Sequence, residues 1–176
     1  MTTYVGLLRG INVGGNNKVP MAALRALCQG LGYADVETYI QSGNVVFDAP
    51  STESDVVADM EAALLSTFGL TLSVVVRSAE QVAAVVAGNP YPGEADGTKV
   101  HITFLSDVLP GTVLAKLDPG ISPSESFAIV DRDMYLHLPG GLGTSKLAVH
   151  LGQKLGKRGT TRNWNTVLTL REMSTR

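Results

Sequence analysis

The stretch LLRGINVGGNNKVPM, residues 7–21, joins an apolar run to a glycine-rich loop and then to the start of a helix. The run over residues 3–11 is rich in Val, Leu and Ile, which predicts a β-strand. Pro20 suits the first turn of a helix, because the N–H that proline lacks has no intrahelical partner there. Apolar residues then recur at spacings of three and four, as on the buried face of a helix: Met21, Leu24, Leu27, Cys28 and Leu31. The stretch therefore predicts a strand and a helix joined by a polar loop.

The remainder of the first half adds strands and helices in a regular order. VETYIQSGNVVF (36–47) predicts a hairpin, because Ser-Gly-Asn can supply the positive φ that a tight turn needs. Residues 51–69 predict a capped helix, 70–77 a strand and 78–90 a short helix. The first half is thus expected to read β-α-β-β-α-β, followed by an extra helix.

The second half begins the same pattern again. Residues 99–107 predict a strand, 110–118 a helix that starts with proline, and 125–139 a strand pair. Residues 143–156 and 161–173 predict two further helices, the second of which closes the chain. We therefore expect an α+β fold built from duplicated β-α-β-β-α halves, each of the ferredoxin-like, split β-α-β type with an antiparallel sheet.

The boundary between the halves is expected in GNPYPGEADG (88–97), which holds two prolines and three glycines. One half would cover residues 1–92 and the other residues 98–176, the second ending in basic helices. A chain of 176 residues suits one ordinary domain or two small halves that share a core. We expect the two halves to pack as one unit.

Charge is unevenly distributed along a chain of globular composition, 44% hydrophobic and 17% charged. Residues 1–145 carry 7 Lys and Arg against 15 Asp and Glu, whereas residues 146–176 carry 7 against 1. A basic end on an acidic body indicates an anionic partner. The alternative is a solvated basic helix surface that pairs with the acidic body.

Cys28 is the only cysteine, so neither an intrachain disulfide nor a cysteine-based zinc site is expected. We expect no metal site, no signal peptide and no membrane-spanning segment, and hence a cytoplasmic location. The only histidines are His101, His137 and His150, and no catalytic motif of the HExxH or GxSxG type is present. The sequence assigns no catalytic residue, cofactor or oligomeric state.

The opening loop lies between a strand and a helix, a setting where backbone N–H groups attract anions. Asn16-Asn17 stands where a Walker A loop requires Lys-Ser or Lys-Thr, so Mg-nucleotide geometry is not expected. Glycines that serve only a tight turn fit the loop as well. The hairpin contributes neutral donors and acceptors suited to a sugar, amide or base edge, namely Gln41, Ser42 and Asn44.

Two segments of the second half are further candidates. In GGLGTSKL (140–147), Thr144 or Ser145 would cap a helix, and an anion bound there would offset Lys146 in the first turn. KRGTTRNWNTV (157–167) combines Lys157, Arg158 and Arg162 with Trp164 and its flanking asparagines, which suits a nucleobase and its phosphate. Trp164 as a buried core anchor is the alternative.

Four segments, YVGLLRGINVGGNNKVPM, TYIQSGNVVF, GLGTSKL and TTRNWNTV, resemble in this order the bacterial family known as domain of unknown function 1697. The resemblance spans nearly the whole chain. It implies a cytoplasmic α+β protein of duplicated β-α-β-β architecture and implies no activity. It marks the polar and glycine positions of these segments as candidate ligand-binding residues: Arg9, Gly10, Asn12, Gly14, Gly15, Lys18, Gln41, Ser42, Gly43, Asn44, Ser145, Lys146, Arg162, Asn163 and Trp164.

The leading hypothesis is a protein that binds an anionic ligand, either a nucleotide or a nucleic acid. Basic residues would meet the anion (Arg9, Lys18, Lys146 and Arg162), and amides would contact neutral groups (Gln41, Asn44 and Asn163). One alternative is an enzyme acting on a small polar metabolite, with His101 or Lys18 as acid or base. The other is a structural or interaction module in which the glycine motifs serve only the fold.

Overall fold

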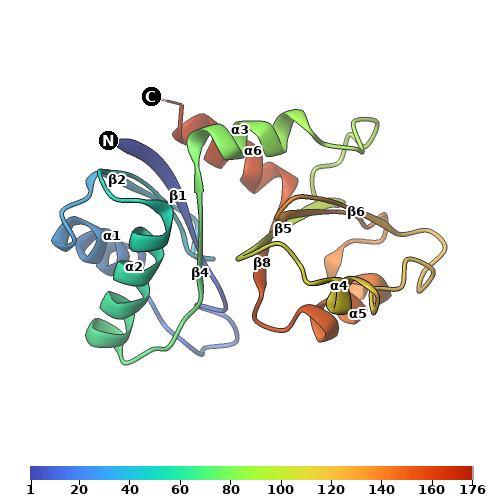
Figure 1. Ribbon diagram of the computed structural model, residues 1–176, viewed down its shortest axis with the longest axis horizontal. Helices are drawn as coiled ribbons and strands as arrows, with labels where there is room; N and C mark the ends of the chain where they lie inside the picture. The colour runs from blue at the N-terminus through green and yellow to red at the C-terminus, as the bar shows by residue number, and fades with distance from the viewer. Residues whose placement is uncertain (176) are drawn as a thin grey trace. The chain divides into compact units, whose positions relative to one another are not determined.

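The computed structural model describes residues 1–175 and contains two four-stranded antiparallel sheets (Figure 1). The chain divides into two compact units. The first comprises Met1–Ala84 and a second stretch that begins at Thr169, and the second comprises Val85–Leu168. Arg176, which belongs to the basic end of the sequence, lies outside the described residues.

The change from the first unit to the second falls within helix α3 (Ala79–Ala87). Residues 88–97, where the sequence predicts the boundary, therefore lie in the second unit. The chain returns to the first unit within helix α6 (Trp164–Met173), the last helix.

The first unit has the predicted order of strands and helices. Its elements are β1 (Thr2–Leu8), α1 (Met21–Gly30), β2 (Ala34–Tyr39), β3 (Asn44–Ala49), α2 (Glu53–Phe68) and β4 (Val74–Ser78). The strand order is β2-β3-β1-β4, and every neighbouring pair is antiparallel. Since β3 lies between β1 and β2, the unit β1-α1-β2 is a split β-α-β, as the sequence predicts.

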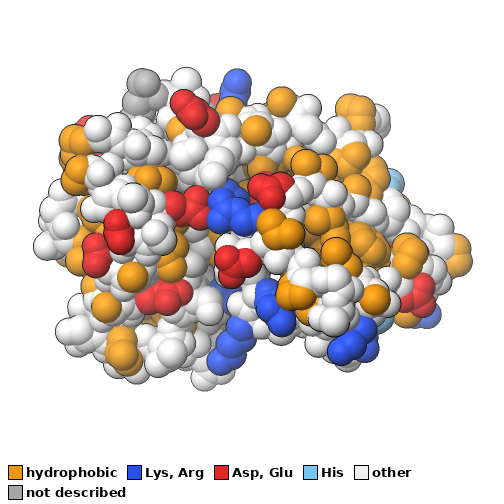
Figure 2. Space-filling model, viewed as in Figure 1, with side chains coloured by type: hydrophobic (Ala, Val, Ile, Leu, Met, Phe, Trp, Pro, Cys, Tyr) orange, Lys and Arg blue, Asp and Glu red, His pale blue; other side chains and the backbone are white. Residues whose placement is uncertain are grey.

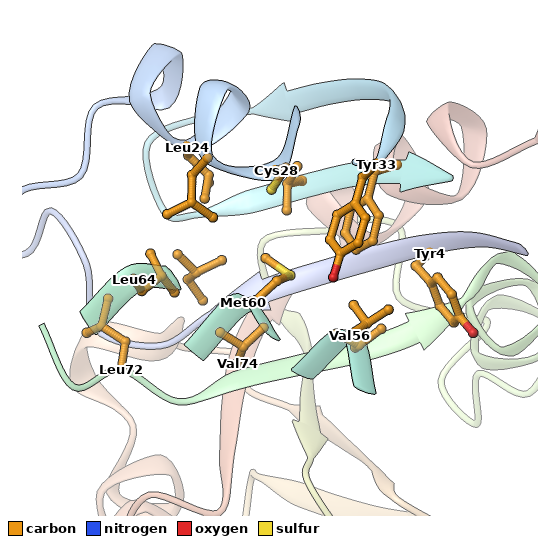
Figure 3. Packing of buried hydrophobic residues seen from close by; sticks show 14 of the residues in the cluster. Tyr4, Leu24, Cys28, Tyr33, Val56, Met60, Leu64, Leu72 and Val74 are labelled. Carbon is orange, nitrogen blue, oxygen red and sulfur yellow. The ribbon is translucent and has the colours of Figure 1, made fainter. Parts of the chain in front are cut away.

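Helices α1 and α2 supply the apolar side chains that cover one face of this sheet (Figure 3). Leu24 and Cys28 of α1 and Met60 and Leu64 of α2 are fully buried, which matches the spacing of three and four in the sequence. Burying each large side chain contributes about 1.5–3 kcal/mol. Helix α2 starts where the Thr52 hydroxyl accepts a hydrogen bond from the Asp55 backbone N–H, at 3.3 Å.

The second unit repeats the arrangement. Its elements are β5 (Val100–Leu105), α4 (Gly111–Leu114), β6 (Ser126–Val130), β7 (Asp133–His137), the 3₁₀ turn η1 (Leu142–Thr144), α5 (Lys146–Leu155) and β8 (Gly159–Asn163). The strand order β6-β7-β5-β8 is that of the first sheet, again with antiparallel neighbours. The predicted α+β fold of duplicated, ferredoxin-like halves is therefore confirmed.

Two predictions about elements of the second unit are wrong. Residues 161–163 are predicted as helix but belong to β8, and α6 begins only at Trp164, because the Asn163 side chain accepts a hydrogen bond from the Thr166 backbone N–H. The helix predicted over 110–118 is limited to the four residues of α4. Its first residue is glycine, two β-branched residues follow, and no side chain caps it, all of which disfavour a longer helix.

The duplication extends to the fourth strand of each unit and to the helix that follows it in the chain. Arg77 is the fourth residue of β4, and Arg162 is the fourth residue of β8; both are buried. The next residues, Ser78 and Asn163, each accept a backbone N–H from three residues further on, which caps the following helix. The sequence pattern that links β4-α3 to β8-α6 is thus a buried arginine followed by a capping residue.

Among residues 1–175, no helix combines the length and the apolar character needed to cross a membrane. The cytoplasmic location expected from the sequence stays a prediction.

Candidate functional site

The two glycine motifs of the first unit meet at one end of its sheet. The loop that follows β1 and the turn that joins β2 to β3 lie together, because β1 and β3 are antiparallel neighbours with Leu7 opposite Asn44. The Leu8 backbone N–H donates to the Gly43 carbonyl at 2.8 Å. The Asn12 side-chain amide donates to the Gln41 carbonyl at 2.8 Å. The structure therefore brings the motifs at residues 9–18 and 41–44 together.

The close approach of the opening loop to the β2–β3 turn requires a glycine at position 43. Its φ of +88° lies in the left-handed region, and a Cβ there would lie 2.7 Å from Ile11 Cδ1 and 2.9 Å from Leu8 Cβ. Both distances are shorter than van der Waals contact, so any side chain would push the loop and the turn apart. The glycine of this motif is explained by the fold.

Asn12 fastens the opening loop from within. Its side-chain amide donates to the Val19 carbonyl and accepts from the Val19 backbone N–H, both at 2.9 Å, besides its bond to Gln41. The residue adopts a positive φ of 54°, which asparagine tolerates better than most residues. These bonds use the donor and acceptor atoms of the Asn12 amide, so its role here is structural.

The glycine pair of the opening loop forms the tip of a small hairpin. The Asn16 N–H donates to the Val13 carbonyl at 3.0 Å, and the Asn12 N–H donates to the Asn17 carbonyl at 3.1 Å. Gly14 (φ +58°) and Gly15 (φ +77°) supply the two positive angles that such a two-residue turn requires. The loop is thus a stapled hairpin, and the tight-turn interpretation accounts for its glycines.

The remaining candidates of the first unit divide between structural and exposed residues. Asn44 is fully buried, and its amide donates to the Tyr39 carbonyl and the Ser42 hydroxyl, both at 2.9 Å. Arg9 is half-buried, and its backbone N–H donates a hydrogen bond to the Ser73 carbonyl at 3.0 Å. Lys18 and Gln41 are exposed residues of the opening loop and the turn.

In the second unit, Ser145 is the cap of α5. Its hydroxyl accepts a hydrogen bond from the Ala148 backbone N–H at 2.9 Å. The Glu125 carboxylate accepts from the Leu147 backbone N–H at 3.0 Å. A carboxylate of the chain therefore already occupies the N-terminus of α5, where it offsets the exposed Lys146 in the first turn.

Arg162, Asn163 and Trp164 stand at the junction of β8 and α6. Arg162 is buried and donates to the Thr160 hydroxyl at 2.7 Å and to the Thr161 carbonyl at 3.0 Å. Burial lowers the pKa of its guanidinium to about 10. Asn163 caps α6, as described above. Trp164 is half-buried, so it is neither a free stacking platform nor a fully buried anchor.

The histidines are placed in two different environments. His101 is 5% exposed, its Nδ1 has no hydrogen-bond partner within residues 1–175, and burial lowers its pKa. A neutral, buried imidazole of this kind does not meet a solvent-borne substrate. His137 lies near the surface, where its Nε2 is 3.0 Å from Glu94 Oε2 and its ring stacks on Tyr91. The hydrogen bond with His137 lowers the pKa of the Glu94 carboxyl.

A groove of about 410 Å³ lies within the second unit, beside the ends of β5 and α5. Its lining combines cations, an acid, a hydroxyl and apolar side chains: Ser106, Asp107, Val108, Leu109, Pro110, Leu155, Lys157 and Arg158. Gly156, with φ +59°, ends α5 and turns the chain toward β8. The Ser106 N–H then donates to the Arg158 carbonyl at 2.7 Å, which fixes the two sides of the groove together.

Lys157 and Arg158 are both exposed residues. Within residues 1–175, neither side chain makes an ion pair or a hydrogen bond with the protein. These cations belong to the basic segment that the sequence singles out, but the other part of the lining, Ser106–Pro110, was not predicted. No motif in the sequence marks this segment.

No cluster of three or more His, Cys, Asp or Glu side chains that could hold a metal ion occurs in the described part of the chain. The groove contains one carboxylate, that of Asp107, which is too few for a dedicated cation site.

Comparisons with known proteins agree with the fold. A solved structure that is similar to this chain is that of the conserved bacterial protein SP0830 from Streptococcus pneumoniae, with 27% sequence identity and a TM-score of 0.82. The similarity covers 99% of each chain. No curated protein matches the sequence significantly. The family model described as "Protein of unknown function (DUF1697)" matches residues 1–135, and the chain belongs to this family.

Proposed function

We propose that the protein binds a small, anionic, phosphate-bearing ligand in the groove of the second unit. The observation that carries this proposal is the pair of adjacent, exposed cations, Lys157 and Arg158, that line one wall without a partner from the described chain. Unpaired cations beside a concave surface offer charge-assisted hydrogen bonds to an incoming phosphate.

The charges of the groove favour a ligand of modest negative charge. Arg158 can present two parallel N–H donors to a phosphate, and Lys157 adds a compact positive charge. Asp107 lies in the same lining, which reduces the net charge of its ionised groups to +1. The Ser106 hydroxyl supplies a further donor. A monophosphate fits this balance better than a triphosphate does.

The shape of the groove favours a single nucleotide over a nucleic acid strand. A volume of about 410 Å³ lies within the 300–1,000 Å³ that is usual for small-molecule sites. The apolar side chains of Val108, Leu109, Pro110 and Leu155 offer contacts for an uncharged body such as a base or sugar. The ligand would thus place its phosphate on the cations and its uncharged part against the apolar wall.

Calorimetric titration with nucleoside monophosphates at two salt concentrations tests the proposal. Each charge-assisted contact contributes about 1.5–3 kcal/mol, so Arg158→Ala should weaken binding about 10- to 150-fold. Lys154→Ala is the matched control, because Lys154 is an exposed cation in the last turn of α5 that does not line the groove. Binding that is absent in the unaltered protein, or equally strong in Arg158→Ala and Lys154→Ala, contradicts the proposal.

A further inference from the structure

We propose that strand β6 is a pairing edge at which a second copy of this chain adds to the second sheet in the antiparallel direction. This inference is independent of the ligand proposal. It rests on the backbone of β6, on its contrast with the equivalent strand of the first unit, and on the self-complementary pairing that its sequence allows.

The outer backbone groups of β6 face away from the sheet. β6 is an end strand in the order β6-β7-β5-β8. A two-residue turn joins it to β7, with Val130 opposite Asp133. In such a hairpin the closing pair is hydrogen-bonded and every second pair follows it. Ser126, Ala128 and Val130 therefore bond to β7, whereas Phe127 and Ile129 direct their N–H and C=O groups outward.

The equivalent edge strand of the first unit is protected against such pairing. β2 carries the charged residues Asp35 and Glu37, and its register with β3 is irregular between Ala34 and Glu37. Asp35 also has a positive φ of 47°. Charges and local irregularities are the devices by which proteins block edge-to-edge association.

The five residues of β6 have none of these protective features, although acids flank the strand at Glu125 and Asp131. Its sequence, SFAIV, contains no charge and no proline, and all five residues pair with β7 in one regular register. Val130 is 56% exposed. Hydrophobic side chains gather on the surface where β6 lies (Figures 1 and 2). An uncharged edge beside an apolar surface is typical of an interaction site.

The sequence of β6 is complementary to itself when two copies run antiparallel. A twofold axis at Ala128 places Phe127 opposite the second copy's Ile129, and the reverse pair follows by symmetry. The two pairs form four backbone hydrogen bonds and bring an aromatic ring against a β-branched side chain twice, a favourable cross-strand combination. Ser126 faces Val130, so no like charges oppose one another within the strand. Just beyond it Glu125 faces the second copy's Asp131, but the Glu125 carboxylate is held within its own chain by the Leu147 N–H at 3.0 Å. The result is a continuous sheet across two copies.

Sedimentation of the full chain from micromolar to submillimolar concentration tests the proposal. A concentration-dependent dimer is expected. Val130→Lys should weaken the dimer at least tenfold, because it places a charge on each side of the new strand pair. The control is Val149→Lys, since Val149 is an exposed valine on α5, 61% exposed against 56% for Val130. A monomer at every concentration, or equal effects of the two variants, overturns the proposal.

A cysteine variant tests the register itself. Ala128 would face its own copy in a pair without hydrogen bonds, where Cα atoms are about 4.5 Å apart, a separation that a disulfide can bridge. Cys28 does not interfere, because it is buried and burial raises its pKa to about 12. Under mild oxidation, Ala128→Cys should form a disulfide-linked dimer much faster than Val149→Cys. Equal rates would exclude the proposed register.

Discussion

Replacing Gly43 by alanine should destabilise the first unit far more than the same change at Gly14. Both glycines have a positive φ, +88° and +58°, so both variants have to hold a Cβ in the left-handed region. That cost is about 1–2 kcal/mol. A Cβ at Gly14 meets nothing within 4 Å, whereas at Gly43 it lies 2.7 Å from Ile11 Cδ1 and 2.9 Å from Leu8 Cβ. Overpacking of this kind costs about 1–3 kcal/mol more.

The expected loss is therefore about 2–5 kcal/mol for Gly43→Ala and about 1–2 kcal/mol for Gly14→Ala. Urea unfolding followed by far-ultraviolet circular dichroism measures both losses. Tryptophan fluorescence would serve less well, because Trp164 lies in the second unit. If Gly43→Ala is no more destabilising than Gly14→Ala, then the close approach of turn and loop does not limit this position and our account of the motif is wrong.

Three further changes test the structural roles assigned to polar residues. Asn12→Ala removes the three side-chain hydrogen bonds that Asn12 makes and should lower the free energy of unfolding by about 1–3 kcal/mol, whereas Asn16→Ala, at the exposed hairpin, should change it little. Glu125→Gln should cost about 0.3–1 kcal/mol in the same urea assay, because the α5 N-terminus loses its negative charge. Burial lowers the pKa of His101, so the unfolded chain binds a proton near pH 6.5 that the folded chain does not. On acidification below that pH the free energy of unfolding should therefore fall by up to about 1.4 kcal/mol per pH unit. His101→Gln should remove this part of the pH dependence.

The strands and helices of the core could be predicted because their apolar residues repeat with a clear period. Leu24 and Cys28 recur at helical spacing, and the predicted helix face is buried. Strand β8 was not predicted, because its sequence, GTTRN, is short and polar. Its buried residues are Thr160 and Arg162, and neither is a residue type that indicates a core position. The structural role of Arg162 could be recognised only by comparison with Arg77, because β4 and β8 occupy equivalent places in the two sheets.

The candidate site was harder to predict, because hydrogen-bonding side chains serve loops and ligands equally well. In the sequence, Asn12 and Asn44 were predicted to bind a ligand, because they are polar residues of glycine-rich motifs. In the structure their side-chain amides donate hydrogen bonds to backbone carbonyls of the protein. The bond between Asn12 and Gln41 joins segments 29 residues apart, so no local sequence pattern predicts it. The bonds from Asn12 to Val19 and from Asn44 to Tyr39 are local, but the sequence does not show whether an asparagine side chain is used within its own loop or by a ligand. The basic pair at 157–158 could be seen in the sequence, but the other residues that line the groove could not.

The two copies of the duplicated fold differ in the loop that follows the first strand. In each unit the first strand is followed by a loop that ends in proline, at Pro20 and at Pro110. In the first unit this loop folds back as a hairpin that Asn12 fastens to its neighbours. In the second unit it is only the short segment after Leu105, with no such hairpin, and it lines the groove. The groove of the ligand proposal is therefore lined by the loop that lacks a hairpin and by the exposed cations Lys157 and Arg158.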